Sequence, residues 1–535
     1  TYPFDLYHIA STYSTATLRG LFYGRSATTF HSAVVALNNT PVYTGTWSAG
    51  SEHLFEITVP VTLLHEGANS IKVTGGISGG ATDEFYVNWF EMAYQALYAT
   101  NVDYVFFSGD VPGTWEYHVS GFSTEEIAVF DITSPSHPVH ILSPLLEPQA
   151  DEYTLRFQQT ASVPSKYYAV APFEYRAPVS IIKDVSSSLH DPGNAADYIV
   201  ITHNSFNPAA VQLADYRHSL GLRTVLVDVQ DIYDEFNYGI RAPQAIRDFL
   251  AYAYTNWRPP AFTYVVLMGD GNYDPKNNFG FGEADFIPAY LEDVDPWMKE
   301  TAADNRYVTI VGNDIFPDVY LGRLPVKTLA EAQVMVAKII SYEQMSPTGG
   351  WNQKALFVAD DRDAGGNFPY FSNMVADFYV PSPYGVDKVY YLVTHSTPAA
   401  ARAAIVQAIN QGRLIVNYVG HGAPTIWASE GLFRRQDIAG LTNGGNLPFI
   451  VPMTCLEGYY IIPSSATTDY SAIAETIVRK SGGGAIASFS PTGQGLASGH
   501  DVMNKALYQA IFFEDVTALG PATTLGKLAL AGMGH

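Results

Sequence analysis

The stretch LPFIVPMTC, residues 447–455, is an apolar run of strand length that ends in the single cysteine of this 535-residue chain. A second apolar run, LIVNYVGHG at residues 414–422, ends in a histidine between two glycines. Short runs that are apolar throughout are typical of parallel strands, because helices cover both faces of such a sheet. The sequence therefore predicts two strands that carry His421 and Cys455 at their carboxyl ends, 455 − 421 = 34 residues apart.

Strand and helix patterns alternate from Asp197 onward. Residues 198–201, 225–227 and 264–270 predict strands, and Pro243 opens a helix with one apolar stripe. A capping-box pattern at Thr328 and Glu331 begins another helix, and a second alternation starts with a strand at 356–359. We predict two α/β subdomains, residues 197–350 and 351–535, with His421 and Cys455 at the sheet edge where open α/β sheets bind ligands.

Residues 1–190 have a different pattern, which predicts an all-β sandwich domain. Short strand-like runs such as 54–59 and 70–74 are separated by turn clusters such as 38–41 and 66–69. No long helix-periodic segment interrupts them, and strands at this spacing are typical of a β-sandwich. A polar stretch at 184–193 predicts the linker that follows.

The composition limits the classes of partner. Hydrophobic residues make up 47% of the chain and the formal charge is −23, so we expect a globular protein with no nucleic-acid partner. No stretch approaches the roughly 20 apolar residues of a membrane span. The chain begins at Thr1, from which we expect that a signal segment has already been removed. The oligomeric state is not indicated.

The cysteine and the histidine together predict nucleophilic chemistry. A thiolate is the nucleophilic form of cysteine, and a neighbouring imidazole favours it. Alone, Cys455 fits a buried apolar residue and His421 fits a residue that packs at a strand end. On consecutive strands at one edge, they favour a thiol hydrolase. The backbone amides of Gly422 and Cys455 are candidate donors to a developing oxyanion.

The residues around this pair carry a family resemblance. NYVGHG at 417–422, Trp427, LTN at 441–443, LPFI at 447–450 and Cys455 closely resemble the gingipain-like cysteine peptidases, whose fold is related to those of caspases and legumain. Weaker matches extend the resemblance over roughly residues 197–535. It implies a caspase-hemoglobinase-like α/β peptidase domain of two subdomains, preceded here by the all-β sandwich domain.

The resemblance also implies an activity and its residues. The protein would be a secreted cysteine endopeptidase in which Cys455 attacks the scissile carbonyl, forms a thioester and is assisted by His421. The family places an acid beside the histidine, for which Asp363 is our first choice and Asp361 our second, although both are equally consistent with solvated loop acids. We expect the substrate pocket to include Trp427, Thr492, Gln494 and Gly495.

Side-chain preference at the cleavage site is where this sequence departs from the family. The arginine- and lysine-cutting members have an acid in the loop that corresponds to 366–370 and a tryptophan after the strand at 485–488. The first loop here has no clear counterpart acid, and residues 490–495 contain no tryptophan. We therefore expect a different or broader preference.

A possible metal loop lies elsewhere in the chain. Asp270, Asn272 and Asp274 have the D-x-N-x-D opening of a calcium loop, but Pro275 and Phe281 replace the glycine and glutamate of an EF-hand. A simple turn is the alternative. Structural calcium is plausible because gingipain-like enzymes bind it, whereas the thiol chemistry requires no cofactor.

Two other functions remain open. The chain could be a surface adhesin with a vestigial peptidase domain, or a transpeptidase in which an amine resolves the thioester. The β-domain is adhesion-like or pro-segment-like. From the resemblance we expect protein or peptide substrates and an extracellular or cell-surface location on a bacterium.

Overall fold

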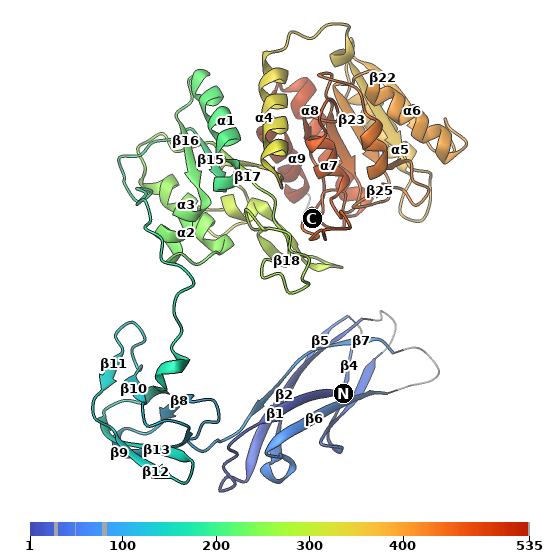
Figure 1. Cartoon of the computed structure of the whole chain (residues 1–535). Coiled ribbons are helices and arrows are strands. Elements are labelled where there is room, and N and C mark those ends of the chain that lie inside the picture. The colour runs from blue at the N-terminus through green and yellow to red at the C-terminus, as the bar shows by residue number, and fades with distance from the viewer. Residues whose placement is uncertain (26–29, 49, 77–82, 533–535) are drawn as a thin grey trace. The chain divides into compact units, whose positions relative to one another are not determined.

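The computed structural model describes residues 1–25, 30–48, 50–76 and 83–532. The chain divides into two compact units, Thr1–Lys183 and Asp184–His535. The N-terminal unit contains strands and short 3₁₀ turns, and the C-terminal unit is α/β (Figure 1). Within the described residues, no helix is long and apolar enough to cross a membrane.

The N-terminal unit has two hydrophobic cores. One lies between the sheets β1-β6-β3-β4 and β5-β2-β7, and the other between the sheets β11-β10-β14-β8 and β12-β13-β9. The strands of the first core are β1 (Tyr2–Leu6), β2 (Thr15–Gly24), β3 (His31–Leu37), β4 (Thr40–Trp47), β5 (Glu52–Pro60), β6 (Gly67–Gly75) and β7 (Phe85–Ala93). The strands of the second are β8 (Tyr104–Gly109), β9 (Gly113–Phe122), β10 (Ala128–Asp131), β11 (Val139–Ile141), β12 (Leu145–Gln149), β13 (Glu152–Ala161) and β14 (Ser165–Val170).

The structure therefore has two sandwiches where the sequence predicted a single one. Alternation along each strand predicts which side chains point inward, and β2 does bury every second residue. Which strands share a core depends instead on long-range pairing, such as that of Tyr2 in β1 with Ile71 in β6. The outer face of the β5-β2-β7 sheet leaves Leu54 and Trp89 exposed on either side of Leu21.

The first α/β subdomain contains a parallel sheet of order β16-β15-β17-β20. Helices α2 and α3 cover one face, and α1 and α4 cover the other. The strands are β15 (Tyr198–Thr202), β16 (Thr224–Asp228), β17 (Tyr264–Met268) and β20 (Tyr320–Leu324); the helices are α1 (Asn207–Ser219), α2 (Val229–Asn237), α3 (Pro243–Asn256) and α4 (Leu329–Gln344). A hairpin of β18 (Leu291–Asp295) and β19 (Lys299–Ala302) projects from it.

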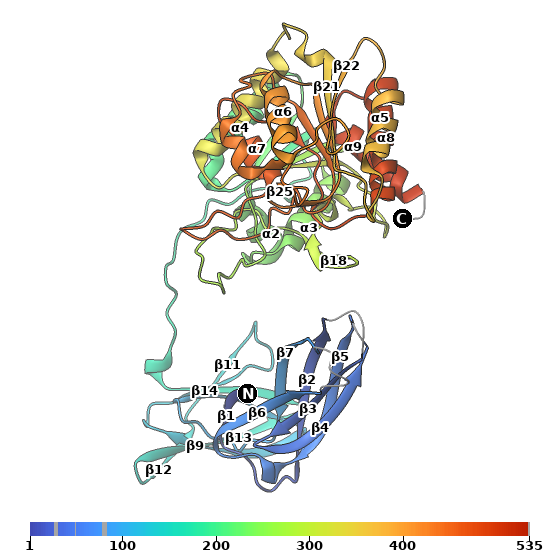
Figure 2. The same cartoon turned by 90° about the vertical axis from the view of Figure 1, so that its right-hand side faces the viewer.

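The second α/β subdomain contains the parallel sheet β22-β21-β23-β27-β28. Helices α6 and α7 lie on the face toward α1 and α4, and α5, α8 and α9 lie on the other face (Figure 2). The strands are β21 (Lys354–Ala359), β22 (Gly385–Tyr390), β23 (Ile415–Val419), β27 (Phe449–Met453) and β28 (Ala487–Ser488). The helices are α5 (Phe368–Phe378), α6 (Pro398–Asn410), α7 (Ile473–Arg479), α8 (Ala497–Phe513) and α9 (Leu519–Gly532).

The predicted fold class, with two α/β subdomains, is confirmed. Local signals set the helix boundaries: Pro243 begins α3, and Thr328 caps α4 in a capping box with Glu331. The stripe of α3 predicted from Ile246 and Phe249 is fully buried. Because one core contains side chains from both sheets, the two subdomains pack into one compact unit.

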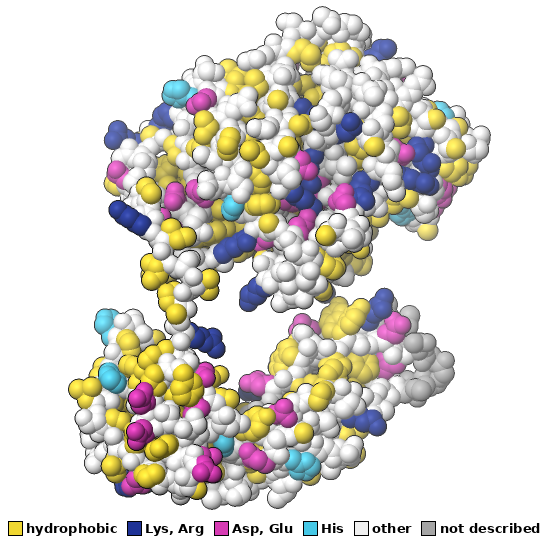
Figure 3. All heavy atoms as spheres, in the orientation of Figure 1, with side chains coloured by type: hydrophobic (Ala, Val, Ile, Leu, Met, Phe, Trp, Pro, Cys, Tyr) yellow, Lys and Arg dark blue, Asp and Glu magenta, His cyan; other side chains and the backbone are white. Residues whose placement is uncertain are grey.

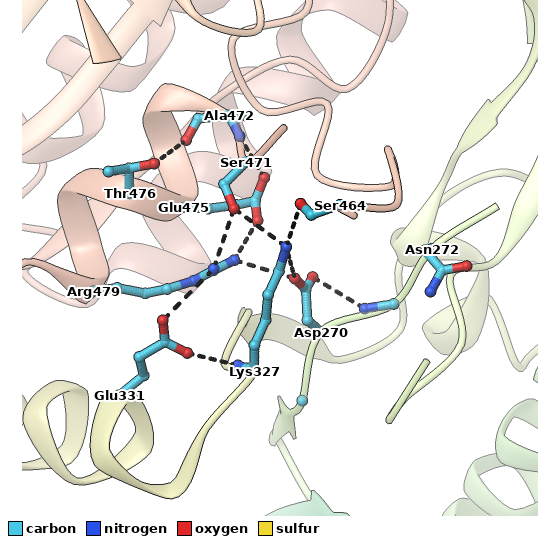
Figure 4. Close-up of polar contacts among 12 residues, drawn as sticks. Asp270, Asn272, Lys327, Glu331, Ser464, Ser471, Ala472, Glu475, Thr476 and Arg479 are labelled. Carbon is cyan, nitrogen blue, oxygen red and sulfur yellow. Dashed lines mark hydrogen bonds and ion pairs between the residues drawn. The ribbon is translucent and has the colours of Figure 1, made fainter. Parts of the chain in front are cut away.

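Buried ion pairs also join the two subdomains (Figure 4). Asp270 follows β17, and its Oδ2 lies 3.1 Å from Nη2 of Arg479 in α7. Lys327, just before α4, has its Nζ 2.5 Å from Glu283 and 3.6 Å from Asp270. Arg479 also contacts Glu475 one helical turn earlier. We call these five residues the inter-subdomain ion cluster.

The exposed surface of the α/β unit mixes charges of both signs. Figure 3 shows Lys and Arg side chains interspersed with Asp and Glu over the face in view, with hydrophobic side chains between them. The net negative charge of the chain is therefore not concentrated in one acidic region on this face.

Candidate active site

Four loops meet at the carboxyl edge of the five-stranded sheet. They follow β21, β23, β27 and β28, and in the sheet β23 lies between β21 and β27. Val419 in β23 pairs with Met453 in β27, and the strands are parallel. His421 and Cys455 each lie two residues beyond that pair, since 421 − 419 = 2 and 455 − 453 = 2. The structure thus places both residues at one edge on neighbouring strands, as predicted.

The His421 ring is oriented by the loop that follows β21. Its Nε2 lies 2.9 Å from Oδ2 of Asp363, and the edge of the Phe368 ring packs against it at 5.2 Å between centroids. A Cβ on Gly365 would lie 2.9 Å from the imidazole, so this close approach requires glycine. The histidine side chain is 53% exposed and therefore accessible to a large ligand.

The structure distinguishes between the two acids that the sequence left open. Asp363 contacts the imidazole, whereas the amide of Asp361 donates to Asp360 at 3.0 Å. Desolvation works to raise the pKa of Asp363, but hydrogen bonds from the Gly365 amide and the His421 ring outweigh it and lower the pKa. Asp363 is thus held as a carboxylate beside the imidazole.

Sequence reasoning missed Asp360, whose carboxyl group contacts the backbone of His421. It is 3% exposed and accepts a hydrogen bond from the backbone amide of His421 at 3.2 Å. Burial raises the pKa of Asp360 to about 6. Its position directly after β21 was the available signal, but the four-residue run DDRD at 360–363 offers three acids that local pattern does not separate.

Cys455 lies half-buried in a sharp turn. Its Sγ is 3.5 Å from the amide nitrogen of Gly495, in the loop after β28. Leu456 has φ +60°, a conformation that costs energy for a residue with a side chain, and its amide donates to Gly493 at 3.0 Å. The loop after β28 therefore holds the turn that presents the thiol.

The two predicted oxyanion donors, Gly422 and Cys455, lie at the carboxyl edge of the sheet, and their backbone amides are not used by the neighbouring strand. The backbone amide of Ala428 donates to the carbonyl of His421. In the antiparallel ladder, Gly422 and Trp427 are therefore a non-hydrogen-bonded pair. The Gly422 amide consequently points away from β25 (Ile426–Trp427). A Cβ on Gly422 would lie 3.1 Å from the carbonyl oxygen of Cys455, so the histidine and cysteine loops touch here. The Cys455 amide donates to no acceptor in the described part of the chain.

Trp427 requires a correction. The sequence analysis assigned it to the substrate pocket, but its side chain is fully buried and stacks on Tyr418 with ring centroids 4.5 Å apart. An indole without exposed surface offers nothing to a substrate. Trp427 instead packs beneath the loop that carries His421.

The other predicted pocket residues lie beside Cys455, on the loop after β28. Gly495 contacts its Sγ, and Gln494 is exposed. The hydroxyl of Thr492 donates to the Ala302 carbonyl at 2.7 Å, and the backbone amide of Gln494 donates to the Asp295 carboxylate at 2.5 Å. The β18–β19 hairpin of the first subdomain thus anchors this loop, and the Thr492 hydroxyl is directed at the hairpin.

The three residues of the predicted metal loop have partners within the protein. Asp270 belongs to the inter-subdomain ion cluster, where Arg479 and Lys327 supply the positive charge that a cation would bring. Asp274 accepts backbone amides of its own loop from Asn278 and Phe279, and Asn272 accepts the amide of Asp274. Over residues 1–25, 30–48, 50–76 and 83–532, no group of three or more His, Cys, Asp or Glu side chains is placed to hold a metal ion. Calcium binding by this protein remains a prediction.

A family model described as peptidase family C25 matches residues 191–534, which is more than half of the chain. The chain belongs to peptidase family C25. This confirms the resemblance to the gingipain-like cysteine peptidases, and the matched residues of this C25 chain coincide with its α/β unit.

Known C25 proteins resemble the same region. Gingipain R2 of Porphyromonas gingivalis is 27% identical over 318 residues, which cover 58% of this chain and 39% of that protein. Lys-gingipain of the same organism is 27% identical over 166 residues, which cover 31% of this chain and 9% of that protein. The crystal structure of the Arg-specific cysteine proteinase gingipain R matches with a TM-score of 0.50 and 25% identity, over 63% of this chain and 72% of that one. This C25 chain thus spans less than half the length of these two curated relatives.

Proposed function

We propose that this protein is a cysteine endopeptidase that cleaves protein substrates through Cys455 and His421. The observation that carries the proposal is the position of both residues two positions beyond a paired residue on neighbouring parallel strands. An acid contacts the ring of the histidine, and the ring is open to solvent. Membership of peptidase family C25 supports the same reaction class.

In this proposal the two ring nitrogens of His421 have different roles. Asp363 accepts a hydrogen bond from Nε2 of His421, so Nδ1 remains to exchange a proton with the thiol and the leaving amine. The Cys455 sulfur attacks the scissile carbonyl, the amine leaves with the proton from His421, and water then hydrolyses the thioester. The amides of Gly422 and Cys455 stabilise the oxyanion of each tetrahedral intermediate.

The biological setting is part of the proposal. The departures from the family at residues 366–370 and 490–495 support a preference at the cleavage site that is different from or broader than arginine or lysine. The resemblance to gingipain-like peptidases supports protein or peptide substrates, an extracellular or cell-surface location and a role for structural calcium. For the N-terminal unit it supports either an adhesion module or a pro-segment. Transpeptidation by the same two residues is the second candidate, because a half-exposed thioester at Cys455 would be reachable by an amine as well as by water.

Casein digestion separates these reactions. We expect hydrolysis products with free carboxyl ends, and mass spectra that remain unchanged when glycine amide is added as a competing amine. The residue before each cleaved bond also reports the side-chain preference. Products extended by glycine amide would establish transpeptidation, and intact casein would contradict the proposed function and favour an adhesin.

Replacing Asp363 by asparagine is expected to lower kcat about 10-fold while changing KM less. The uncharged asparagine side chain cannot stabilise the His421 imidazolium as a carboxylate does. It also no longer selects the His421 tautomer with the proton on Nε2. The effect is moderate because both side chains are about half-exposed, at 53% and 46%. Steady-state kinetics of Asp363→Asn and Asp361→Asn on one peptide checks this, and a larger loss in Asp361→Asn would contradict the assignment.

A further inference from the structure

A buried carboxylic acid two residues after Cys455 has no charged or hydrogen-bonding partner among the described residues. Seven acids are buried among the described residues: Asp270, Asp274, Asp285, Asp295, Asp360, Glu457 and Glu475. Six of them accept backbone amides or pair with a cation. Glu457 is completely buried, and neither of its carboxyl oxygens has a hydrogen-bond partner in the described structure.

Glu457 lies where three segments of the candidate active site meet. The Ser490 hydroxyl, in the loop after β28, and the Trp427 indole, in the hairpin after His421, face its carboxyl without reaching ordinary hydrogen-bond geometry. The next residue packs tightly, since a Cβ on Gly458 would lie 2.8 Å from Cβ of Ser490. The carbonyl of Glu457 accepts the amide of Ala474 in α7 at 3.3 Å.

No charge balances this carboxyl from any element packed against it. Among the described residues, neither β25 nor the loop after β28 presents a cation or a second acid to it. The charged side chains of α7, Glu475 and Arg479, contact each other in the inter-subdomain ion cluster. The other titratable groups of the adjoining loops include Cys455, His421, Glu430, Tyr459, Tyr460 and Asp469. None of them acts on the pKa of Glu457.

A carboxylate in this position would be costly, because burying an unpaired charge requires several kcal/mol. The neutral acid suits the site better, since its carbonyl oxygen can accept from the Trp427 indole and its O–H can donate to Ser490. Burial raises the pKa of Glu457 to about 7. The group therefore changes charge within the pH range in which a thiol peptidase operates.

We propose that Glu457 is a positioning residue for Cys455: as a neutral acid it joins the turn at 455–458 to the loops of Trp427 and Ser490, and its ionisation loosens that turn and lowers activity at alkaline pH. The turn needs such support because Leu456 is held at φ +60°. This inference rests on the proposed peptidase function. It goes further by naming the group that sets the alkaline limit of activity.

The decisive variant is Glu457→Gln, which keeps the shape, one donor and one acceptor but cannot ionise. We expect kcat/KM of the wild type to fall about 10-fold per pH unit on the alkaline side, as one ionisation requires. In Glu457→Gln this limb should be absent or displaced by at least about one pH unit. Glu514→Gln makes the same chemical change at an exposed position after α8 and should retain the wild-type profile. An identical alkaline limb in Glu457→Gln and the wild type would overturn the inference.

Thermal unfolding provides a measurement that needs no substrate. The folded pKa of Glu457 lies above its ordinary value of 4.5, so its contribution to the free energy of unfolding falls as pH rises from about 4.5 to about 7 and is constant above that. The difference in Tm between Glu457→Gln and the wild type should grow across this window and then stay constant. A difference independent of pH would show that the acid is not held neutral. If the wild type cleaves no protein, the proposed function fails, and the calorimetry still tests the neutral acid.

Discussion

Cys455→Ala is expected to lower the rate of casein hydrolysis by a factor on the order of 10⁴ or more, because it removes the nucleophile of the proposed reaction. Alanine occupies less volume than cysteine, so the turn at 455–458 can keep its backbone. Among the described residues, the hydrogen-bond contacts of the sulfur are with the backbone of Gly495 alone, at 3.5 and 3.7 Å, and these are long. The measurement is the release of casein fragments at equal concentrations of folded protein.

Two controls make the Cys455 result specific. Thr517→Ala changes an exposed residue before α9 and should retain full activity. Iodoacetamide should alkylate Cys455 in the native wild type faster than in the denatured protein, because the imidazole favours the reactive thiolate. Casein hydrolysis that persists in Cys455→Ala would exclude this residue as the nucleophile. Slower alkylation in the native state would show that the thiol is not activated.

Arg479→Met is expected to destabilise the α/β unit by about 3–5 kcal/mol, the usual cost of removing one partner of a buried ion pair. The arginine is 8% exposed and lies between Asp270 and Glu475, which are 4% and 2% exposed. Burial raises the pKa of both acids, and the guanidinium opposes that effect. Without it, two buried acids share the single ammonium of Lys327.

Calorimetry of the full chain at two pH values tests this prediction. The loss in Arg479→Met should be larger at pH 8 than at pH 5, because protonation neutralises the acids that have lost their cation. Lys388→Met breaks a more exposed pair with Asp377, with side chains 29% and 52% exposed, and should cost at most about 1 kcal/mol. Equal effects of the two variants would show that the inter-subdomain ion cluster contributes no more than a surface pair.

The effect of Arg479→Met should also reach the active site. The segment between Cys455 and α7 contacts the cluster through Ser464 and Ser471, whose hydroxyls each lie 3.2 Å from Nζ of Lys327. The same segment contacts the first subdomain at Asp304 through the hydroxyl of Tyr460. The first subdomain thus supports the segment that follows Cys455, although it supplies neither Cys455 nor His421.

Local pattern was sufficient for the α/β architecture and for the placement of the two candidate catalytic residues. Apolar runs of strand length predict parallel strands, and any residue just past the end of such a strand lies at one edge of the sheet. His421 and Cys455 could therefore be placed from sequence alone. The capping box at Thr328 could also be predicted from local pattern, because its hydrogen bonds join residues three positions apart.

Side-chain direction and long-range contacts decided the rest. Asp361 and Asp363 are equivalent in sequence, and only the path of the loop after β21 shows that Asp363 reaches the imidazole. Trp427 turned inward, Asp270 paired with an arginine 209 residues away, and the β-strands divided between two cores. Periodicity in the sequence indicates which face of a helix or strand is apolar. The partner of a polar group, by contrast, is set by elements distant in the chain. For this reason only the tertiary structure revealed that the buried acid Glu457 is unpaired among the described residues.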